Sequence, residues 1–354
     1  MKYDVIIIGG GAAGYFSAIN IKEKRPDLSV LILEKSLKPL SKVKISGGGR
    51  CNVTHACFDP KKLVEHYPRG SKELLGPFTR FGPLETKAWF ESRGVKLKAE
   101  EDGRMFPVTD NSQTIIDLFE SEVKRLGVEV MLGASVKRVE PGFKVYLKDQ
   151  AFEAKYLVMT TGSSGWGWEV LKELGHTIVE PVPSLFTFNC PESKLIDLPG
   201  IAVSNAHVQI IGTLFQFTGP VLTTHWGFSG PAVLKLSAFA ARYLNEKGYQ
   251  AEIEIDWQPN PEIKLPKRLE KCLDPEEIHS SRYRVKGKST FKYEFTTAGG
   301  VELREVHFKS NQSKKIQGLF LAGEVLNIDG ITGGFNFQNA WTGGWLISEH
   351  LASC

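Results

Sequence analysis

The sequence lacks the long apolar segments of membrane and secreted proteins. Its longest uninterrupted apolar runs, at 5–8 and 319–322, are far shorter than the roughly twenty residues that cross a bilayer. Near the amino terminus, Asp4 and three glycines interrupt what would have to be the apolar region of a signal peptide. We therefore expect a cytoplasmic protein without a membrane partner.

Cysteine and concentrated charge are also scarce. The five cysteines are an odd number without a Cys-x-x-Cys pair, which does not indicate a disulfide framework. His55 lies between Cys51 and Cys57, but no second Cys/His pair completes the four ligands of a zinc site, so we expect no metal. Lys and Arg number 44 against 40 Asp and Glu, without a block of like charges, so we expect no nucleic acid as the main partner.

The first 34 residues predict a nucleotide-binding unit. The apolar run DVIII predicts a strand buried on both faces, and three glycines complete the pattern G-x-G-x-x-G at its end. A helix predicted over 12–24 would point its free N–H groups at a pyrophosphate, and a second strand ends at an acid suited to the ribose hydroxyls. The predicted cofactor contacts here are Gly9, Gly11, Ala13, Gly14, Glu34 and Lys35.

The carboxyl end favours FAD over NAD. A strand predicted at 319–322 runs into a Gly-Glu pair, and a Gly-Gly pair then opens a helix predicted over 335–351. The amino-terminal dipole of that helix would stabilise the negative charge that grows at N1 and O2 of a flavin on reduction. Taken alone, the segment also fits an ordinary buried helix with a glycine cap. The predicted contacts are Gly323, Glu324, Gly334, Phe335 and Asn336.

A strand returning to the sheet is predicted near the middle of the chain. The segment 128–161 contains strand-like runs, a hairpin from about Phe143 to Phe152, and an apolar strand that stops at Thr161 and Gly162. We expect these last two residues near the pyrophosphate or ribityl chain, and the backbone of Val136 near the adenine edge.

The stretch SGGGRCNVTHAC at 46–57 is either a flavin cradle or a redox dithiol. Five residues stand between its two cysteines, whereas disulfide reductases of this fold hold theirs on a helix with four residues between them. Consecutive glycines suit a backbone that approaches a ligand closely, and an arginine beside them suits a pyrophosphate or a reduced flavin. We therefore predict a cradle, with contacts from Lys42, Ser46, Gly47, Arg50, Cys51 and Asn52.

Six motifs follow one another along the chain: IIIGGGAAG, SGGGRCN, EEDGRMFP, THWGFSGPAVLKLS, TTAGGVELREV and AGEVLNIDGITGGFNFQNAW. In this order they resemble a family of bacterial NAD(P)/FAD-dependent oxidoreductases that includes aminoacetone oxidases and dehydro-bile-acid reductases. The resemblance implies an α/β fold in which a Rossmann-like, glutathione-reductase-like FAD-binding domain is split by an inserted β-rich domain with a short helical piece.

The sequence departs from this family in two places. Asn327 stands where members carry Asp, so any carboxylate role there falls to Glu324 or Asp329. The helical subdomain before TTAGGV is abbreviated, because 259–288 offers only short helical pieces. The basic side chains Lys264, Lys267, Arg268 and Lys271 are interpreted as a solvated helix face.

The middle of the chain changes character and predicts the inserted domain. Its β-like runs are bounded by Gly and Pro and followed by a helix predicted over 231–247. We expect an FAD-binding domain at 1–184 and 290–354 and a substrate or cap domain at 185–289, which agrees with a length too great for one core. Within the insertion, His225 is the candidate catalytic acid or base, although a histidine that orders its loop is as good an interpretation.

The pattern as a whole predicts an FAD-dependent oxidoreductase. A tightly bound flavin would pass hydride to or from a small organic substrate. Because no second strand–helix unit carries G-x-G-x-x-G, we expect NAD(P)H either to bind transiently at the flavin face as a donor or not to bind at all. Two alternatives stay open: a pyridine-nucleotide disulfide reductase and a flavin-containing RNA-modifying protein. Nothing in the sequence specifies an oligomeric state.

Overall fold

The computed structural model describes residues 1–289 and 296–354. They form two compact units, which we name the Rossmann unit (Met1–Pro181 and Gly299–Cys354) and the inserted unit (Val182–Ala298). The chain leaves the Rossmann unit within β10 (Ile178–Ser184), which pairs with β18 (Thr296–Val301). The predicted return at Thr290 lies outside the described residues.

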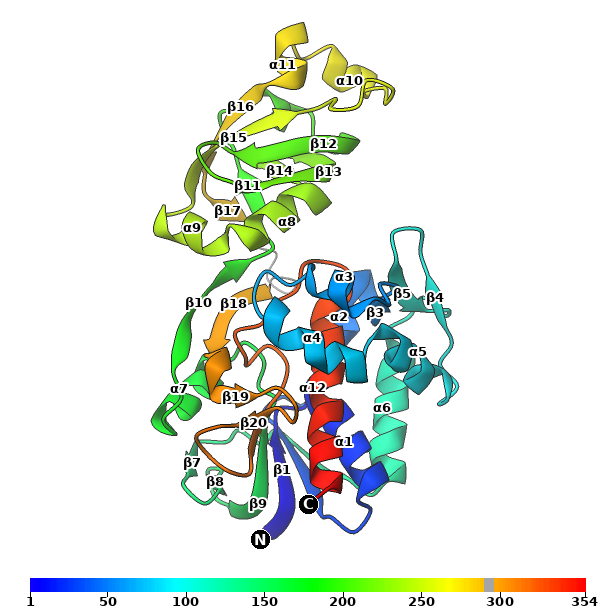
Figure 1. Ribbon diagram of the computed structural model, residues 1–354, viewed down its shortest axis with the longest axis vertical. Helices are drawn as coiled ribbons and strands as arrows, with labels where there is room; N and C mark the ends of the chain where they lie inside the picture. Colours follow the sequence, from blue (N-terminus) through cyan, green and yellow to red (C-terminus); the bar gives the residue numbers. More distant parts are fainter. Residues whose placement is uncertain (290–295) are drawn as a thin grey trace. The chain divides into compact units, whose positions relative to one another are not determined.

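A mixed sheet forms the centre of the Rossmann unit (Figure 1). Its parallel strands are β1 (Lys2–Ile8), β2 (Val30–Glu34), β6 (Glu129–Leu132), β9 (Ala151–Met159) and β21 (Leu319–Leu321), in the order β21-β9-β1-β2-β6. The apolar residues of these strands, 5–8 in β1, 30–33 in β2 and all of β21, are buried because helices or loops cover both faces of such a sheet. This confirms the predicted α/β fold.

Two long helices lie side by side along this sheet (Figure 1). They are α1 (Ala12–Lys24), directly after β1, and α12 (Phe335–Ala352), near the carboxyl end of the chain. A cluster of aromatic side chains joins them, since Phe16 of α1 lies 5.2 Å from Trp341 of α12 between ring centroids. The two sequence ends therefore build one layer of the core.

Smaller elements surround this core. The helices α2 (Ser41–Gly49), α3 (Pro60–Val64), α4 (Ser71–Arg80), α5 (Pro83–Glu91), α6 (Gln113–Arg125) and α7 (Gly165–Glu173) follow in chain order. One antiparallel sheet has the order β3-β5-β4, with β3 at Thr54–His55, β4 at Leu97–Ala99 and β5 at Arg104–Pro107. The strands β7 (Arg138–Glu140), β8 (Lys144–Tyr146), β19 (Val306–His307) and β20 (Gln312–Ser313) extend the main sheet.

The inserted unit is a sheet that closes on itself. Its strands are β11 (Thr187–Asn189), β12 (Ala202–Ile210), β13 (Gln216–Thr224), β14 (Gly227–Ser229), β15 (Gln250–Asp256), β16 (Ser281–Lys286) and β17 (Lys288–Ser289). The order is β16-β15-β12-β13-β14-β11-β17, and the first and last members are consecutive in the chain, joined at Gly287. The segment 281–289 therefore pairs with both ends of the sheet and closes it as a barrel.

Helices of the inserted unit cover part of this barrel. The predicted helix over 231–247 is divided into α8 (Pro231–Phe239) and α9 (Ala241–Glu246) at Ala240, and α8 packs against β12 and β13. Two short helices, α10 (Lys267–Glu270) and α11 (Pro275–His279), stand in the region where the sequence indicated an abbreviated helical piece. No helix in the described ranges is long and apolar enough to cross a membrane.

Candidate flavin-binding site

The glycine pattern lies where β1 turns into α1, at the carboxyl edge of the sheet. Each outer glycine is required by close backbone contacts: a Cβ on Gly9 would lie 2.4 Å from the Thr160 carbonyl oxygen, and one on Gly14 would lie 2.1 Å from that of Gly9. A Cβ on Gly11 would meet nothing within 4 Å. No side chain caps α1, whose first residues include Ala13, so its free N–H groups and the open space at Gly11 suit a pyrophosphate.

Glu34 ends β2 and holds the glycine turn. One carboxylate oxygen accepts from the backbone N–H of Gly10 at 2.6 Å, and the other accepts from that of Ser36 at 2.7 Å. Lys35 is exposed beside it. The Ala134 N–H donates to the Glu34 carbonyl at 2.8 Å, which brings the buried Val136 into the same region.

The end of β9 brings together residues from three separate motifs. Thr161 has a buried hydroxyl oxygen without a hydrogen-bond partner among the described residues, and Gly162 adopts a left-handed φ of 59°. Lys42 donates to Ser163 at 3.3 Å and forms an ion pair with Glu324, which follows Gly323 after β21. Three of the predicted contacts, Lys42, Gly162 and Glu324, therefore lie together, and Ser163 joins them without having been predicted.

The glycines of SGGGRCN form a left-handed turn at the end of α2. The φ values of Gly47, Gly48 and Gly49 are 58°, 67° and 84°, which side chains with a Cβ rarely adopt. A Cβ on Gly47 would lie 2.9 Å from the Phe106 ring, whereas the other two have open space. The sequence indicated glycines for a close approach to a ligand, and the structure adds that the left-handed backbone conformation by itself favours glycine at all three positions.

The two cysteines of this stretch are free thiols in poor surroundings for a redox pair. Burial raises the pKa of Cys51 to about 12, and burial also raises the pKa of Cys57. Ser46 accepts the Cys51 N–H through its carbonyl at 3.0 Å, which closes the glycine turn. Thiolates are the reactive form, so this geometry speaks against the disulfide-reductase alternative.

Asn52 connects the glycine turn to the start of α12. With its amide oriented to satisfy its neighbours, the side-chain oxygen accepts from the Gly334 N–H at 3.0 Å and the nitrogen donates to the Thr54 carbonyl at 3.0 Å. Gly334 has a φ of 88°, and a Cβ there would lie 2.6 Å from the Thr54 oxygen. SGGGRCN and the carboxyl-terminal motif therefore meet at the amino terminus of α12.

Side chains around this helix start are tightly organised. The Phe335 ring stacks on the rings of His55 and His66, with centroid distances of 4.8 and 4.3 Å. The backbone carbonyl of Phe335 accepts a hydrogen bond from the Tyr67 hydroxyl at 2.6 Å. Asn336 exchanges two hydrogen bonds with the backbone of Gly330, at 2.8 and 2.9 Å. The first turn of α12 thus has a fixed direction.

The acidic candidates near this helix are both paired. Asp329 is fully buried and forms an ion pair with Arg69, which sequence reasoning missed. Asn327, which stands in place of the family Asp, has a buried side-chain oxygen without a partner among the described residues. Arg50 donates to Glu100 at 2.6 Å, so its charge is already offset by a carboxylate of the EEDGRMFP motif.

The candidate catalytic residue belongs to the inserted unit. His225 and Trp226 form the turn between β13 and β14, and both side chains are exposed. The Thr224 hydroxyl donates to the Gly227 carbonyl at 3.0 Å across this turn, so the loop does not depend on the imidazole for its closure. The role of His225 stays a prediction.

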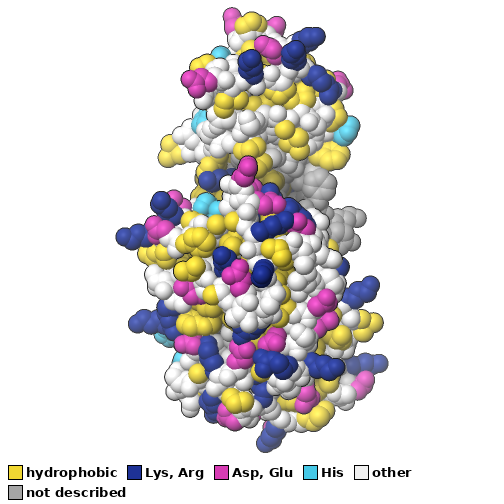
Figure 2. All heavy atoms as spheres, turned by 90° about the vertical axis from the view of Figure 1, so that its right-hand side faces the viewer, with side chains coloured by type: hydrophobic (Ala, Val, Ile, Leu, Met, Phe, Trp, Pro, Cys, Tyr) yellow, Lys and Arg dark blue, Asp and Glu magenta, His cyan; other side chains and the backbone are white. Residues whose placement is uncertain are grey.

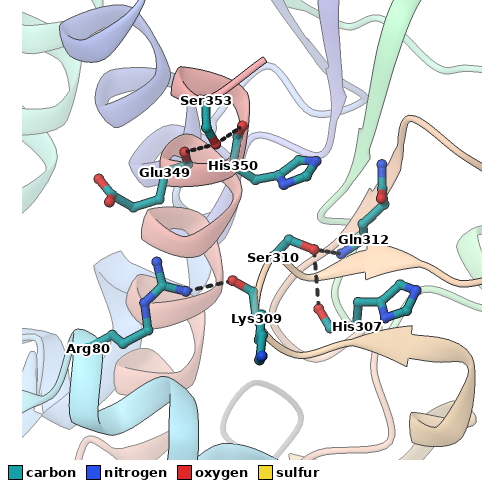
Figure 3. Close-up of a pocket in the computed structure, with 8 residues that line it drawn as sticks. All are labelled: Arg80, His307, Lys309, Ser310, Gln312, Glu349, His350 and Ser353. Carbon is teal, nitrogen blue, oxygen red and sulfur yellow. Dashed lines mark hydrogen bonds between the residues drawn. The ribbon is translucent and has the colours of Figure 1, made fainter.

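A separate hollow of about 510 Å³ lies at the other end of α12 (Figure 3). Because a helix rises about 1.5 Å per residue, the 18 residues of α12 put it roughly 27 Å from Gly334. None of the predicted contacts lines it, and it does not belong to the candidate site. Its lining residues are Arg80, His307, Lys309, Ser310, Gln312, Glu349, His350 and Ser353.

The residues of the site fit FAD. An extended dinucleotide needs room at the central glycine, a polar partner near the end of β9 and a helix amino terminus at its far end. Gly11, Thr161 and Gly334 supply these three features within the Rossmann unit.

Comparisons with known proteins agree with this arrangement. The model of the HI0933-like protein Rossmann domain matches residues 3–350. The ribosomal RNA dihydrouridine synthase of Escherichia coli K12 is 28% identical over 99% of this chain and 98% of its own. The 3-dehydro-bile acid delta(4,6)-reductase of Clostridium scindens is 26% identical over 98% of both chains.

Solved structures show the same fold at low identity. A 3-ketosteroid-delta4-(5alpha)-dehydrogenase from Rhodococcus jostii aligns with a TM-score of 0.58 and 14% identity, over 99% of this chain and 97% of its own. The E. coli alignment spans 408 positions and this chain has 354 residues, so at least 54 positions have no counterpart here.

Proposed function

The chain belongs to the HI0933-like Rossmann family of FAD-binding oxidoreductases, and on this premise we propose that it reduces a carbon–carbon double bond conjugated to a carbonyl group. The small organic substrate predicted from the sequence would be a cyclic compound with such a bond. NAD(P)H would be the reductant.

One observation carries this proposal: two relatives aligned along their whole lengths bear names that describe the same bond change. A delta(4,6)-reductase of a 3-dehydro-bile acid saturates double bonds in conjugation with a ketone. A dihydrouridine synthase saturates a ring double bond next to a carbonyl of uracil. The conjugated carbonyl accepts the charge that develops when hydride adds to the distant carbon.

The roles of individual residues follow from the balance of this reaction. When bound between the glycine turn of β1 and the start of α12, FAD would supply hydride-transfer chemistry. The N–H groups at the start of α12, near Gly334 and Asn336, would stabilise negative charge at the flavin ring. Hydride adds to one carbon and a proton must reach its neighbour, and His225 is our candidate for that proton donor.

A second candidate substrate is a uridine in ribosomal RNA. Two relatives carry the corresponding name, from E. coli and from Haemophilus influenzae, the latter 27% identical over 98% of this chain. Charge gives this candidate little support, since Lys and Arg exceed Asp and Glu by only four, and basic and acidic side chains are interspersed on the face of the Rossmann unit that Figure 2 shows. We therefore place the small cyclic substrate first.

Anaerobic reduction of the FAD-loaded protein by NADH and by NADPH tests the donor, and a screen of oxidants tests the acceptor. We expect cyclic enones to reoxidise the flavin and to gain two hydrogens by mass spectrometry, while saturated ketones do not. An unmodified ribosomal RNA transcript forms the second arm. Turnover with RNA but with none of the enones would contradict the small-substrate proposal, and turnover with saturated ketones alone would contradict double-bond reduction.

A further inference from the structure

The guanidinium of Arg50 is held by residues from a different part of the chain. Its Nη1 donates to Glu100 Oε1 at 2.6 Å and lies 3.5 Å from Asp110 Oδ1. The group lies 4.0 Å from the centroid of the Phe106 ring. The side chains of Arg50 and Glu100 are 32% and 28% exposed, so water screens this pair less than a surface pair.

Glu100 also holds a second cation beside the same ring. Its other oxygen accepts from Arg104 Nη2 at 3.0 Å, and that guanidinium lies 5.5 Å from the Phe106 centroid. Asp102 and Asp110 complete the group by pairing with Arg104 and Lys98. Three cations and three carboxylates therefore share this cluster, and their charges cancel.

The Phe106 ring joins this cluster to the loop that we assign to the flavin. Phe106 contacts the glycine turn so closely that a Cβ on Gly47 would lie 2.9 Å from its ring. Two residues after Arg50, Asn52 reaches Gly334 at the start of α12. Arg50 thus belongs to the neutral cluster and also stands two residues from Asn52, which contacts the start of α12.

We propose that Glu100 is a positioning residue of the flavin site, which orients Arg50 beside the glycine turn and offsets its charge. The reduction potential of bound FAD is then lower than it would be beside an Arg50 without this carboxylate. Reduction adds negative charge to the flavin, so an uncompensated cation nearby favours the reduced form. The inference rests on FAD binding and is independent of the substrate chosen under the proposed function.

The test is a dye-equilibrated, anaerobic titration of the flavin potential in the FAD-loaded protein and its variants. Glu100→Gln keeps the shape and removes the charge, and we expect a more positive potential. Arg50→Gln should give a more negative potential, and the double variant should return close to the wild-type value because the two charges are removed together. Asp102→Asn is the matched control, since that carboxylate contacts Arg104 rather than Arg50, and we expect a smaller shift.

Two results would overturn the proposal. One is a Glu100→Gln protein that retains FAD and shows an unchanged or more negative potential. The other is an Asp102→Asn shift as large as that of Glu100→Gln, which would mean a general effect of the cluster. If Glu100→Gln does not retain FAD, Asp110→Asn replaces it, because Asp110 also faces Arg50: a positive shift supports the proposal and no shift overturns it. The readout is the potential, so failure of the double-bond assay leaves it unaffected.

Discussion

Glu34 joins the two sides of the nucleotide turn through its bonds to the Gly10 and Ser36 N–H groups. We expect Glu34→Ala to weaken FAD binding about 10- to 100-fold, because hydrogen bonds to a charged group contribute roughly 1.5–3 kcal/mol. The measurement is the dissociation constant of FAD for the apoprotein. Asp27→Ala, in the exposed turn before β2, is the control and should bind FAD normally. Equal affinities of the two variants would remove Glu34 from the site.

The thiols of Cys51 and Cys57 should not take part in turnover. Because burial raises the pKa of Cys51 to about 12, this thiol stays protonated near neutral pH, and we expect alkylation many times slower than for the exposed Cys354. Peptide mapping after timed iodoacetamide treatment measures this. Cys51→Ser and Cys57→Ser should retain hydride uptake, whereas Arg50→Ala should impair it. Two thiols appearing on reduction by NAD(P)H would instead support a dithiol enzyme.

At this scale, sequence patterns predict only part of the geometry. The glycine fingerprint and Glu34 belong to one local unit with fixed spacing, so their proximity follows from the motif. The pairs Lys42–Glu324 and Arg69–Asp329 join residues more than 250 positions apart, and a single sequence does not specify such partners. The sequence selected Glu324 and Asp329 as alternatives for one carboxylate role, but their pairing with different cations separates them.

The beginning of α12 depends on a glycine that the surroundings do not allow to be replaced. Gly334→Ala would bring a Cβ within 2.6 Å of the Thr54 oxygen and within 2.8 Å of the Asn52 side chain, in a left-handed conformation. We expect FAD loss and a free energy of unfolding lower by more than about 1 kcal/mol. Gly165→Ala at the start of α7 is the control, since its Cβ would meet nothing within 4 Å. FAD content and urea unfolding of both variants check this, and a normal Gly334→Ala protein would contradict it.

A buried histidine network couples β20 to the segment before β10. His176 bonds to Glu305 at 2.9 Å and to Ser313 at 3.0 Å. Burial lowers the pKa of His176. Burial acts to raise the pKa of Glu305, but hydrogen bonds from Lys315, Thr177 and His176 outweigh it and lower that pKa to about 2.

Both shifts make the folded state less stable in acid. Unfolded His176 takes up its proton near about pH 6.5, before the folded residue does, so stability falls as the pH drops below that value. The contribution of Glu305 is present above its ordinary pKa of 4.5 and is lost as the pH falls towards about 2.

At about pH 8 we expect His176→Gln to unfold at a lower urea concentration than the wild type, because its free energy of unfolding is lower by roughly 1–3 kcal/mol. Between about pH 6.5 and pH 5 the variant should lose less stability than the wild type does. His307→Gln, at an exposed position of the same unit, should keep the wild-type pH dependence. An unchanged pH dependence in His176→Gln would assign the acid sensitivity to other groups.

Elements with a strong local pattern were predicted well, and elements that depend on distant partners were not. The helix at 12–24 has the bounds given by the sequence, and α12 ends one residue beyond its predicted limit. The segment SRYRVK, which forms β16, does not stand out as a strand in the sequence because charged side chains occupy its outward positions. Glu254 and Glu252 of β15 offset two of these charges, which only the folded structure shows. The break at Ala240 is likewise not visible in the apolar pattern of 231–247.

For the whole molecule, we assign residues from both ends of the chain to one dinucleotide site, and we therefore expect the purified protein to be yellow with one FAD per chain. FMN would leave Glu34 without a ribose to bind. Absorbance of the released cofactor, its mass and the protein concentration measure the identity and the ratio. Released FMN or NAD would contradict the assignment, and half-occupancy that FAD addition does not raise would contradict one site per chain.

The closing strand of the inserted unit has a consequence for how the chain folds. Thr187 of β11 pairs with Ser289 of β17, and about a hundred residues separate these two partners along the sequence. Strand pairing between such distant segments is slow to form. Until 281–289 docks, β15 and β11 each present an unpaired edge, which is a template for association with another chain. During synthesis the barrel remains open until its last strand has emerged from the ribosome. We therefore expect the half-made inserted unit to be the form that chaperones must protect from aggregation.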